Sequence, residues 1–313
     1  MQLKIYNNEN TYVVNGPVYV NETTKIWCGK ISDGEFKGAF VKILNYGELD
    51  DKAAKNELKN VLREEVNTLK QVSKCSKRVP SVKDYWDDTR ESRYVVIMDT
   101  MPGVSLRAWL DKHQRDELQA KDIFIRKCLV IQICEIMRDI SNKYPVLVHR
   151  DLKPENIFVN FNKETKKWDI YIIDFGCANL NYIRNIGTTN YQAPEQLGIR
   201  NTRVSITNKT DIFAIGQIMY EMLLGRVPTI GAEYQYKARQ DTWIQIPQLP
   251  AYLEKISGVK EMEDIINKMT SFEINDRLTY GDIIRNLKHI KIGKYDGRSV
   301  SYTHLRAHET RRH

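Results

Sequence analysis

The residues from Val148 to Glu195 hold the side chains of this chain that are best suited to chemistry. The stretch begins with V-H-R-D-L-K-P-E-N-I-F-V, continues with I-I-D-F-G and ends in G-T-T-N-Y-Q-A-P-E. Its charged and amide side chains are expected to share one polar site: Asp151, Lys153, Asn156 and Asp174. Asparagine and carboxylate oxygens are the hard ligands that Mg²⁺ prefers. The set therefore predicts phosphoryl transfer from a nucleotide bound with magnesium.

The order and wording of these motifs resemble the signature set of eukaryotic-type protein kinases, in their Ser/Thr-specific branch. The resemblance covers residues 12–290 and implies an α+β, two-lobed protein-kinase fold. A small β-rich N-lobe with one main helix is expected over 12–101, and a larger helical C-lobe over 102–290. Residues 291–299 would be a tail, and 300–313 resemble the translation of a sequencing adapter, so we leave them out of the fold.

The elements that position these residues follow from the hydrophobic pattern. Residues 11–44 and 78–101 alternate as strands, and Met101-Pro102-Gly103 is the expected linker between the lobes. Helical periodicity predicts helices near 51–73, 118–142, 211–224, 250–256, 260–270 and 279–288. The helix at 211–224 is apolar on nearly every side, so it should be buried at the centre of its lobe.

Lys42 and Glu65 are expected to form an ion pair. Lys42 shares one face of its strand with Phe40, while Val41 takes the other face. Glu65 lies within the leucine stripe of the helix at 51–73, where a buried carboxylate needs a cation. The pair resembles the strand lysine and helix glutamate of the kinase family, which implies that Lys42 holds the α- and β-phosphates of ATP.

The resemblance also gives the other site residues their roles. It implies that Asp151 accepts or orients the proton of the substrate hydroxyl and that Lys153 places a charge on the transferring phosphate. Asn156 and Asp174 would hold Mg²⁺, and Thr188 would bond Asp151 or Lys153. His149 is expected to be a buried structural residue in an internal stack and not a catalytic one, its partners being Leu69, Phe175 and Tyr85.

An adenine pocket is implied by the same resemblance. Ile26 and Ala39 would form its roof, Phe158 its floor, and Met98 would occupy the gatekeeper position. The backbone of Asp99 and of Met101 would hydrogen-bond the adenine edge.

The chain departs from the family pattern in two places. The phosphate-binding loop, about Tyr19 to Ile26, lacks the glycines that let backbone amides approach phosphate closely. This departure supports an alternative, a kinase-like nucleotide-binding pseudokinase or interaction scaffold with little activity. The segment between Gly176 and Gly187 contains no Ser or Thr, and Tyr182 is its only hydroxyl. We therefore expect activity without phosphorylation in that segment.

At Lys153 and Thr188 the motifs resemble those of Ser/Thr-specific kinases, so protein Ser/Thr hydroxyls are the expected substrates. Glu155 and Glu221 are candidates for binding basic residues near the target hydroxyl. Small-molecule phosphotransferases have a similar phosphoryl-transfer pocket, but they lack the Ala-Pro-Glu segment found here. In the scaffold, Glu195 is expected to pair with Arg277, and Asp211 to cap the backbone of the catalytic loop.

Composition argues against several other classes of protein. The chain has 313 residues and a net charge of +8 spread among acidic residues, which disfavours a nucleic-acid partner. No apolar run is long enough to span a bilayer, so no membrane association is expected. Five cysteines form neither a disulfide framework nor a metal-like pair. A monomeric catalytic domain in the cytoplasm, with the nucleus left open, is the expectation.

Overall fold

The computed structural model describes residues 2–7, 11–21, 26–47, 51–178, 187–198, 205–227 and 249–293. The chain divides into two compact units. The first unit comprises the residues up to Met101 together with Asp174–Asn179, and the second comprises Pro102–Ile173 and the residues from Leu180 onward. The adapter-like residues 300–313 and most of the expected tail lie outside the described residues.

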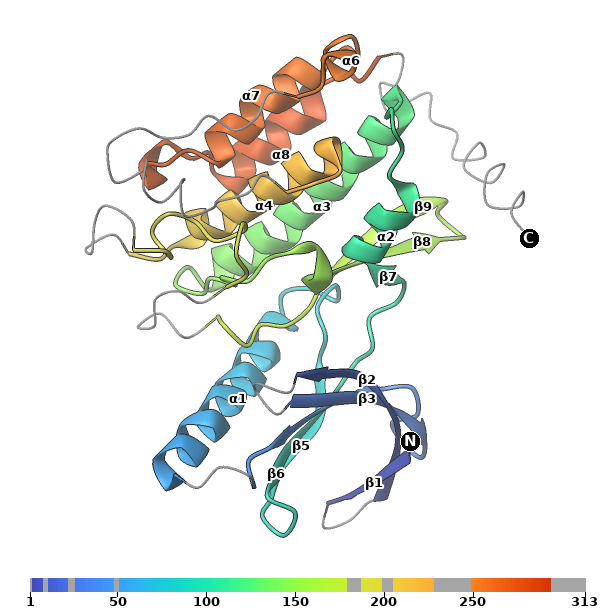
Figure 1. Ribbon diagram of the computed structural model, residues 1–313, viewed down its shortest axis with the longest axis vertical. Coiled ribbons are helices and arrows are strands. Elements are labelled where there is room, and N and C mark those ends of the chain that lie inside the picture. The colour runs from blue at the N-terminus through green and yellow to red at the C-terminus, as the bar shows by residue number, and fades with distance from the viewer. Residues whose placement is uncertain are drawn as a thin grey trace. The chain divides into compact units, whose positions relative to one another are not determined.

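The first unit is built from one sheet and one helix (Figure 1). Its strands are β1 (Gln2–Tyr6), β2 (Thr11–Asn21), β3 (Ile26–Asp33), β4 (Phe40–Asn45), β5 (Val82–Asp88) and β6 (Arg93–Met98). Its helix is α1 (Lys52–Val72). The sheet is antiparallel, in the order β1-β2-β3-β4-β6-β5.

The sheet curls until its two edge strands approach each other. Asn7, which follows β1, donates its side-chain amide to Asp84 of β5 over 2.6 Å, and Tyr12 donates its hydroxyl to the same carboxylate over 3.3 Å. The curled inner face encloses an apolar cluster of Ile5, Tyr12, Val14, Ile31, Val41, Ile43, Val95 and Ile97. Since Ile5 belongs to this core, β1 is an integral strand, which the sequence analysis did not predict.

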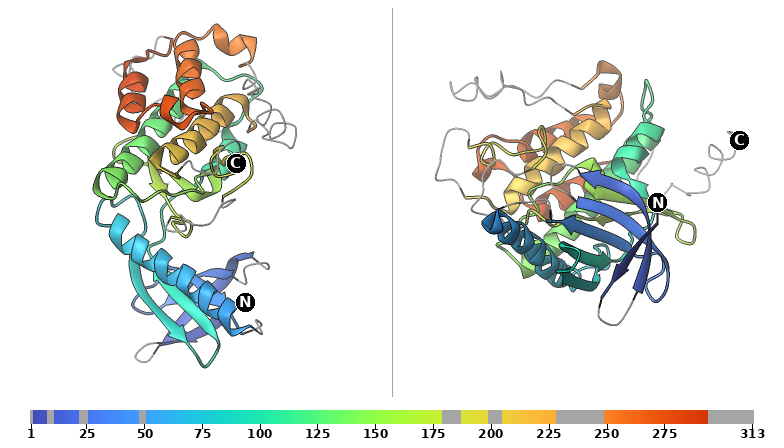
Figure 2. Two further views of the ribbon diagram at one scale, coloured as in Figure 1. Left: turned by 90° about the vertical axis from the view of Figure 1, so that its left-hand side faces the viewer. Right: turned by 60° about the horizontal axis from the view of Figure 1, so that its bottom comes forward.

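Helix α1 lies across β5 and β6, as the left view of Figure 2 shows. Asp51 caps its N-terminus by accepting hydrogen bonds from the N–H groups of Ala53 and Ala54. The predicted apolar stripe of this helix is buried at Leu62, Leu69 and Val72. The helix predicted for 51–73 is therefore confirmed to within a residue at each end.

The second unit is mostly helical and carries a small three-stranded sheet (Figure 1). Its helices are α2 (Leu106–His113), α3 (Ala120–Lys143), α4 (Asn208–Leu224), α6 (Ala251–Glu254), α7 (Val259–Met269) and α8 (Tyr280–His289). The described residues of this unit also form the 3₁₀ turns η1 (Pro154–Asn156) and η2 (Ile274–Asp276). They form the strands β7 (Val104–Ser105), β8 (Ile157–Asn162) and β9 (Lys167–Ile172) as well. The stretch between Asn156 and Asp174 is thus a β-hairpin.

Helix α4 is the centre of this unit. It packs against α3 and α7, and nearly all of its residues are buried. Gly216 lets α7 approach closely, because a Cβ at this position would lie 2.6 Å from a methyl of Thr270. Gly225 ends the helix in the left-handed conformation with φ 78°, which only glycine adopts without strain. The predicted buried central helix is confirmed.

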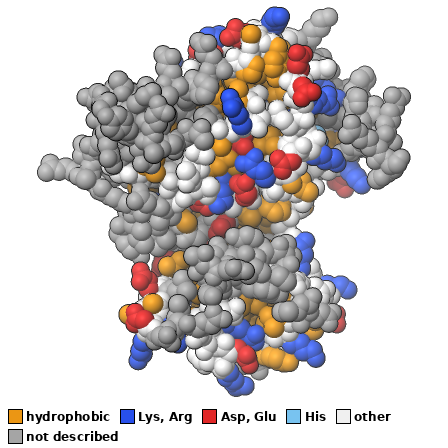
Figure 3. All heavy atoms as spheres, viewed as in Figure 1, with side chains coloured by type: hydrophobic (Ala, Val, Ile, Leu, Met, Phe, Trp, Pro, Cys, Tyr) orange, Lys and Arg blue, Asp and Glu red, His pale blue; other side chains and the backbone are white. Residues whose placement is uncertain are grey.

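The described surface mixes charges of both signs. On the face seen in Figure 3, Lys and Arg side chains lie among Asp and Glu side chains. Within the described ranges, no helix is both long and apolar enough to cross a membrane.

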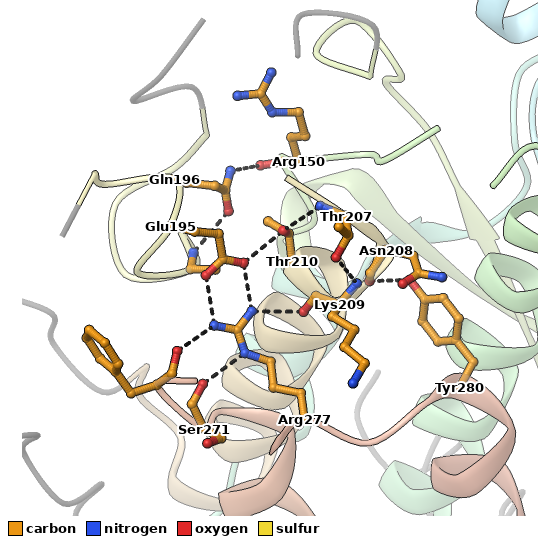
Figure 4. Close-up of polar contacts among 12 residues, drawn as sticks. Arg150, Glu195, Gln196, Thr207, Asn208, Lys209, Thr210, Ser271, Arg277 and Tyr280 are labelled. Atoms are coloured by element: carbon orange, nitrogen blue, oxygen red, sulfur yellow. Dashed lines mark hydrogen bonds and ion pairs between the residues drawn. The ribbon is translucent and has the colours of Figure 1, made fainter. Parts of the chain in front are cut away.

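Every N–H group of the Arg277 side chain is hydrogen-bonded (Figure 4). It donates five hydrogen bonds, to both carboxylate oxygens of Glu195 (2.7 and 2.8 Å) and to the carbonyls of Lys209, Ser271 and Phe272. Its side chain is 0% exposed and that of Glu195 is 4% exposed. The predicted ion pair is confirmed, and it ties the Ala-Pro-Glu segment to Arg277, the C-cap residue of η2.

Replacing Arg277 with Met should lower the free energy of unfolding by about 3–5 kcal/mol, because Glu195 is left as a buried carboxylate without its cation. The measurement is urea unfolding followed by tryptophan fluorescence. Arg285→Met is the matched control, since the Arg285 side chain is 65% exposed. A surface change of this kind should stay within about 0.5 kcal/mol. Equal effects of the two substitutions would contradict the role assigned to the buried pair.

Candidate active site

The catalytic-loop residues of the second unit form a closed hydrogen-bonded group. Thr188 donates its hydroxyl to Asp151 Oδ1 over 2.7 Å, and Lys153 Nζ donates to Thr188 Oγ1 over 2.7 Å. Lys153 Nζ also lies 2.9 Å from Asp151 Oδ2. The sequence left open whether Thr188 bonds Asp151 or Lys153, and it bonds both. This arrangement holds the Asp151 carboxylate in a single orientation.

Asn156 fixes the other side of Asp151. Its amide nitrogen donates to the backbone oxygen of Asp151 over 2.9 Å and to Asp151 Oδ2 over 3.3 Å. Because its amide nitrogen is committed to Asp151, Asn156 could hold a cation only through its amide oxygen. The 3₁₀ turn η1, which begins at Pro154, brings Asn156 back towards Asp151.

The backbone of this loop is hydrogen-bonded to the side chain of Asp211 on α4. The two carboxylate oxygens of Asp211 accept the N–H groups of His149 and Arg150, each over 2.8 Å. Arg150 has φ 69°, a left-handed conformation that is costly for a residue with a Cβ. Burial raises the pKa of Asp211, while His149 and the two backbone N–H bonds favour the charged form. Asp211 therefore caps the loop backbone, as the sequence predicted.

His149 is a structural residue. It is 0% exposed, and its Nε2 lies 3.0 Å from the backbone oxygen of Ile173. The prediction that Tyr85 belongs to an internal stack with it is wrong, because Tyr85 is 42% exposed. Tyr85 alternates outward on β5, and its ring lies 3.9 Å from Lys70 Nζ of α1.

The first unit carries a second charged group, centred on Lys42. Its ammonium donates to both oxygens of Glu65, over 2.8 and 2.7 Å, and lies 3.5 Å from Asp174 Oδ1. Gly176 packs against these carboxylates, since a Cβ there would lie 3.3 Å from an oxygen of each. Asp174 has φ 63°, a second strained backbone angle at the site. The predicted ion pair between Lys42 and Glu65 is present.

Electrostatics keep Lys42 charged although it is buried. Burial alone would lower the pKa of Lys42, but the negative charges of Glu65 and Asp174 raise it well above its ordinary value. For Glu65 the effect of burial has the opposite sign: it raises the pKa of the carboxyl group, while the charge of Lys42 lowers it. Lys42 is therefore a charged ammonium held in a fixed position by two carboxylates.

Ala39 does not lie where the sequence analysis expected it. It packs against the inner core together with Val41 and Ile43, on the face of β4 opposite to Lys42. Strand alternation makes this unavoidable, because Ala39 is three residues from Lys42. Phe40 shares the face of Lys42 instead, and its cross-strand neighbour on β6 is Met98.

Cys28 is a residue of this face that the sequence analysis missed. It is the β3 partner directly opposite Lys42, and it is 5% exposed. Burial raises the pKa of its thiol to about 11, although Lys42 acts in the opposite direction. The thiol is therefore protonated at neutral pH and adds a small neutral group beside the lysine. Pairing register, which no sequence motif encodes, is the signal that identifies it.

The other predicted adenine-binding residues take separate positions. Met98 is buried at the end of β6, and the N–H of Asp99 donates to Ser81 O over 3.0 Å, so Asp99 can offer adenine only its carbonyl. The Asp99 carboxylate bonds Ser81 and Lys83, which lower its pKa against the effect of burial. Met101 ends the first unit.

Phe158 lies on β8, paired with Ser105 and Tyr171. Ile26 begins β3 opposite Leu44. The described residues do not include the glycine-poor loop at 22–25 or the side chain of Ile26. They also leave out residues 179–186, which contain Tyr182.

Comparison with known proteins gives one family. The model of the protein kinase domain matches residues 38–289. Human serine/threonine-protein kinase Nek2 is 28% identical over 278 residues, which cover 83% of this chain and 56% of the relative. Mouse Aurora kinase C is 24% identical over 281 residues, which cover 88% of this chain and 91% of the relative.

The chain thus spans little more than half the length of human Nek2. The family match begins after β3, so the glycine-poor stretch lies before it. The match includes Lys42 and Glu65 of the first unit and the residues from Asp151 to Thr188. A match over this share of the chain, with this geometry, establishes that the chain belongs to the protein kinase family.

Proposed function

We propose that this chain transfers the γ-phosphoryl group of ATP to Ser or Thr hydroxyls of protein substrates. The observation that carries the proposal is the bonded group of Thr188, Asp151 and Lys153, which presents an oriented carboxylate with a cation beside it. The names of the curated relatives, which are serine/threonine-protein kinases, support the same substrate class. Phosphoryl transfer needs such positioning more than it needs covalent catalysis.

In the proposed mechanism, Asp151 is the group that meets the substrate hydroxyl. Its Oδ1 is held by Thr188, and its Oδ2 faces Lys153 and Asn156. The carboxylate orients the hydroxyl and accepts its proton as the oxygen attacks the γ-phosphorus and ADP leaves. Lys153 stabilises the charge that spreads over the transferring phosphoryl group.

The nucleotide would be held by the first unit. Lys42, fixed by Glu65, is the residue proposed to contact the α- and β-phosphates. The Asp99 carbonyl and the Met101 backbone would bond the adenine edge, with Ile26, Met98 and Phe158 lining the base. Phe40 takes the place proposed for Ala39, because it shares the face of Lys42. A phenyl ring in this place narrows the space for the base.

Asp174 and Asn156 are the residues proposed to hold Mg²⁺. The Asp174 side chain is 44% exposed, and Asn156 has its amide nitrogen committed to Asp151. One carboxylate and one amide oxygen fit a cation that keeps several waters and takes its other ligands from substrate phosphates. When bound, the cation neutralises charge on the phosphates.

Asp151→Asn and Lys42→Met should each lower transfer of radiolabelled phosphate from ATP to a panel of Ser/Thr protein substrates. Removing the general base alone costs about 100-fold or more in rate. The full chain is compared with both variants after their thermal unfolding has been matched. Transfer by the parent and its loss in the variants are the expected results, and phosphoamino-acid analysis should find phosphoserine or phosphothreonine.

A folded parent chain that transfers no phosphate, yet gains thermal stability from magnesium and ATP, would overturn the proposed activity. That outcome would favour the nucleotide-binding scaffold suggested by the glycine-poor loop. Phosphotyrosine as the product would overturn the substrate class alone.

Glu65→Gln should lower kcat/KM for ATP by about tenfold to 100-fold, because Lys42 loses a charged hydrogen-bond partner worth about 1.5–3 kcal/mol. Glu64→Gln is the matched control, since Glu64 is the exposed neighbour on the same helix. Steady-state kinetics with varied ATP give both values. If the two substitutions changed kcat/KM equally, the buried pair would have no special part in nucleotide binding.

A further inference from the structure

Arg107 lies at the centre of a charged network in the second unit. From the first turn of α2, its guanidinium donates to Glu155 Oε1 over 2.9 Å, to Glu221 Oε1 over 2.5 Å and to the Tyr191 hydroxyl over 2.9 Å. Tyr191 in turn donates to Glu221 Oε2 over 2.6 Å. Four separate segments of the unit, α2, η1, the stretch 187–198 and α4, thus meet at one guanidinium.

This network lies next to the groups proposed to meet the substrate hydroxyl. Glu155 comes two residues after Lys153 in η1, and Tyr191 comes three residues after Thr188. Lys153 and Thr188 bond each other and Asp151. A peptide whose hydroxyl reaches Asp151 therefore passes close to the network. The side chains of Arg107 and Glu155 are 33% and 47% exposed, so solvent and a peptide can reach them.

The charges explain why Arg107 is needed there. Glu221 is 3% exposed, and its carboxylate shares the guanidinium with Glu155. Burial alone would lower the pKa of Arg107, but its bonds to Glu221 and Glu155 raise it, so the guanidinium stays charged. Without this cation, a buried and a half-exposed carboxylate would face each other unpaired, which is unfavourable. Such a pair would bind a guanidinium supplied from outside.

We propose that Arg107 is a built-in counter-ion that determines substrate specificity: it occupies the acidic pair Glu155 and Glu221, so the enzyme does not select substrates with a basic residue beside the target hydroxyl. The sequence had suggested that these glutamates bind a basic residue of the substrate. Both carboxylate oxygens of Glu221 and one oxygen of Glu155 are instead bonded within the chain. This proposal rests on the proposed function and adds that the substrate peptide needs no basic residue at this subsite.

Arg107→Ala is the variant that tests it. The substrates are a neutral serine peptide and a set in which one arginine is moved along each side of the serine. For the parent, kcat/KM should change little along the set. For Arg107→Ala, arginine at one position should raise kcat/KM about tenfold or more over the neutral peptide, as expected for a charged hydrogen bond. A preference of that size in the parent chain would overturn the proposal.

Two further variants separate specificity from structural damage. Arg107→Ala combined with Glu155→Gln should lose most of the gained preference. Arg107→Gln keeps a long polar side chain without the charge, and it should give the same preference if the alanine variant folds poorly. Arg138→Ala is the matched control, because Arg138 is a partly exposed arginine of the same unit paired with Asp139, and it should leave the peptide ranking unchanged. An unchanged ranking in Arg107→Ala and Arg107→Gln would overturn the proposal.

Binding provides a readout that does not depend on transfer. Peptides with alanine in place of serine are titrated by fluorescence anisotropy. The arginine peptide should bind Arg107→Ala about tenfold more tightly than it binds the parent, with the neutral peptide unchanged. If the parent transferred no phosphate to any peptide, the proposed function would fall, while this titration would still decide the role of Arg107. Equal binding to both chains would overturn it.

Discussion

The Asp211 carboxylate is the interaction on which the second unit's part of the site depends. It enters from α4, the most buried helix of the unit, and accepts the backbone N–H groups of His149 and Arg150. These bonds hold Arg150 at a positive φ, and the Arg150 carbonyl then accepts Gln196 Nε2 over 2.9 Å (Figure 4). Gly187 packs against the same carbonyl, where a Cβ would lie 2.7 Å away. One buried carboxylate therefore sets the loop that carries Asp151 and the segment that carries Thr188.

The two units solve the problem of buried charge in different ways. In the first, Lys42 is surrounded by Glu65 and Asp174, so a cation is held ready in a largely buried place. In the second, Glu195 and Arg277 neutralise each other completely and serve the scaffold alone. A buried pair of this second kind adds little net stability compared with an apolar pair, but the loss of one partner is costly. The side chain of Lys42 keeps 13% of its surface exposed, whereas that of Arg277 is fully buried.

The network around Arg107 shows why a charged motif cannot be assigned a ligand from its residues alone. Sixty-five residues lie between Glu155 and Glu221 in the sequence, so the two carboxylates come together only when the chain folds. The same folding brings Arg107 to both of them. The guanidinium satisfies both carboxylates and the Tyr191 hydroxyl at once. The electrostatic character of the surface near Asp151 is thus a property of four segments taken together.

The sequence by itself determined the family, the described helices other than α2, the buried central helix and the pairs Lys42–Glu65 and Glu195–Arg277. Motifs and helical periodicity are local features of a chain, so they can be read from it directly. Tertiary structure decided what depends on register and convergence. It put Ala39 on the core face and Phe40 and Cys28 beside Lys42, since each strand residue faces the side that pairing dictates. It added β1 to the sheet through its contact with the core, and it paired Arg107 with two distant glutamates. Those contacts join residues far apart in the chain, so no local pattern could specify them.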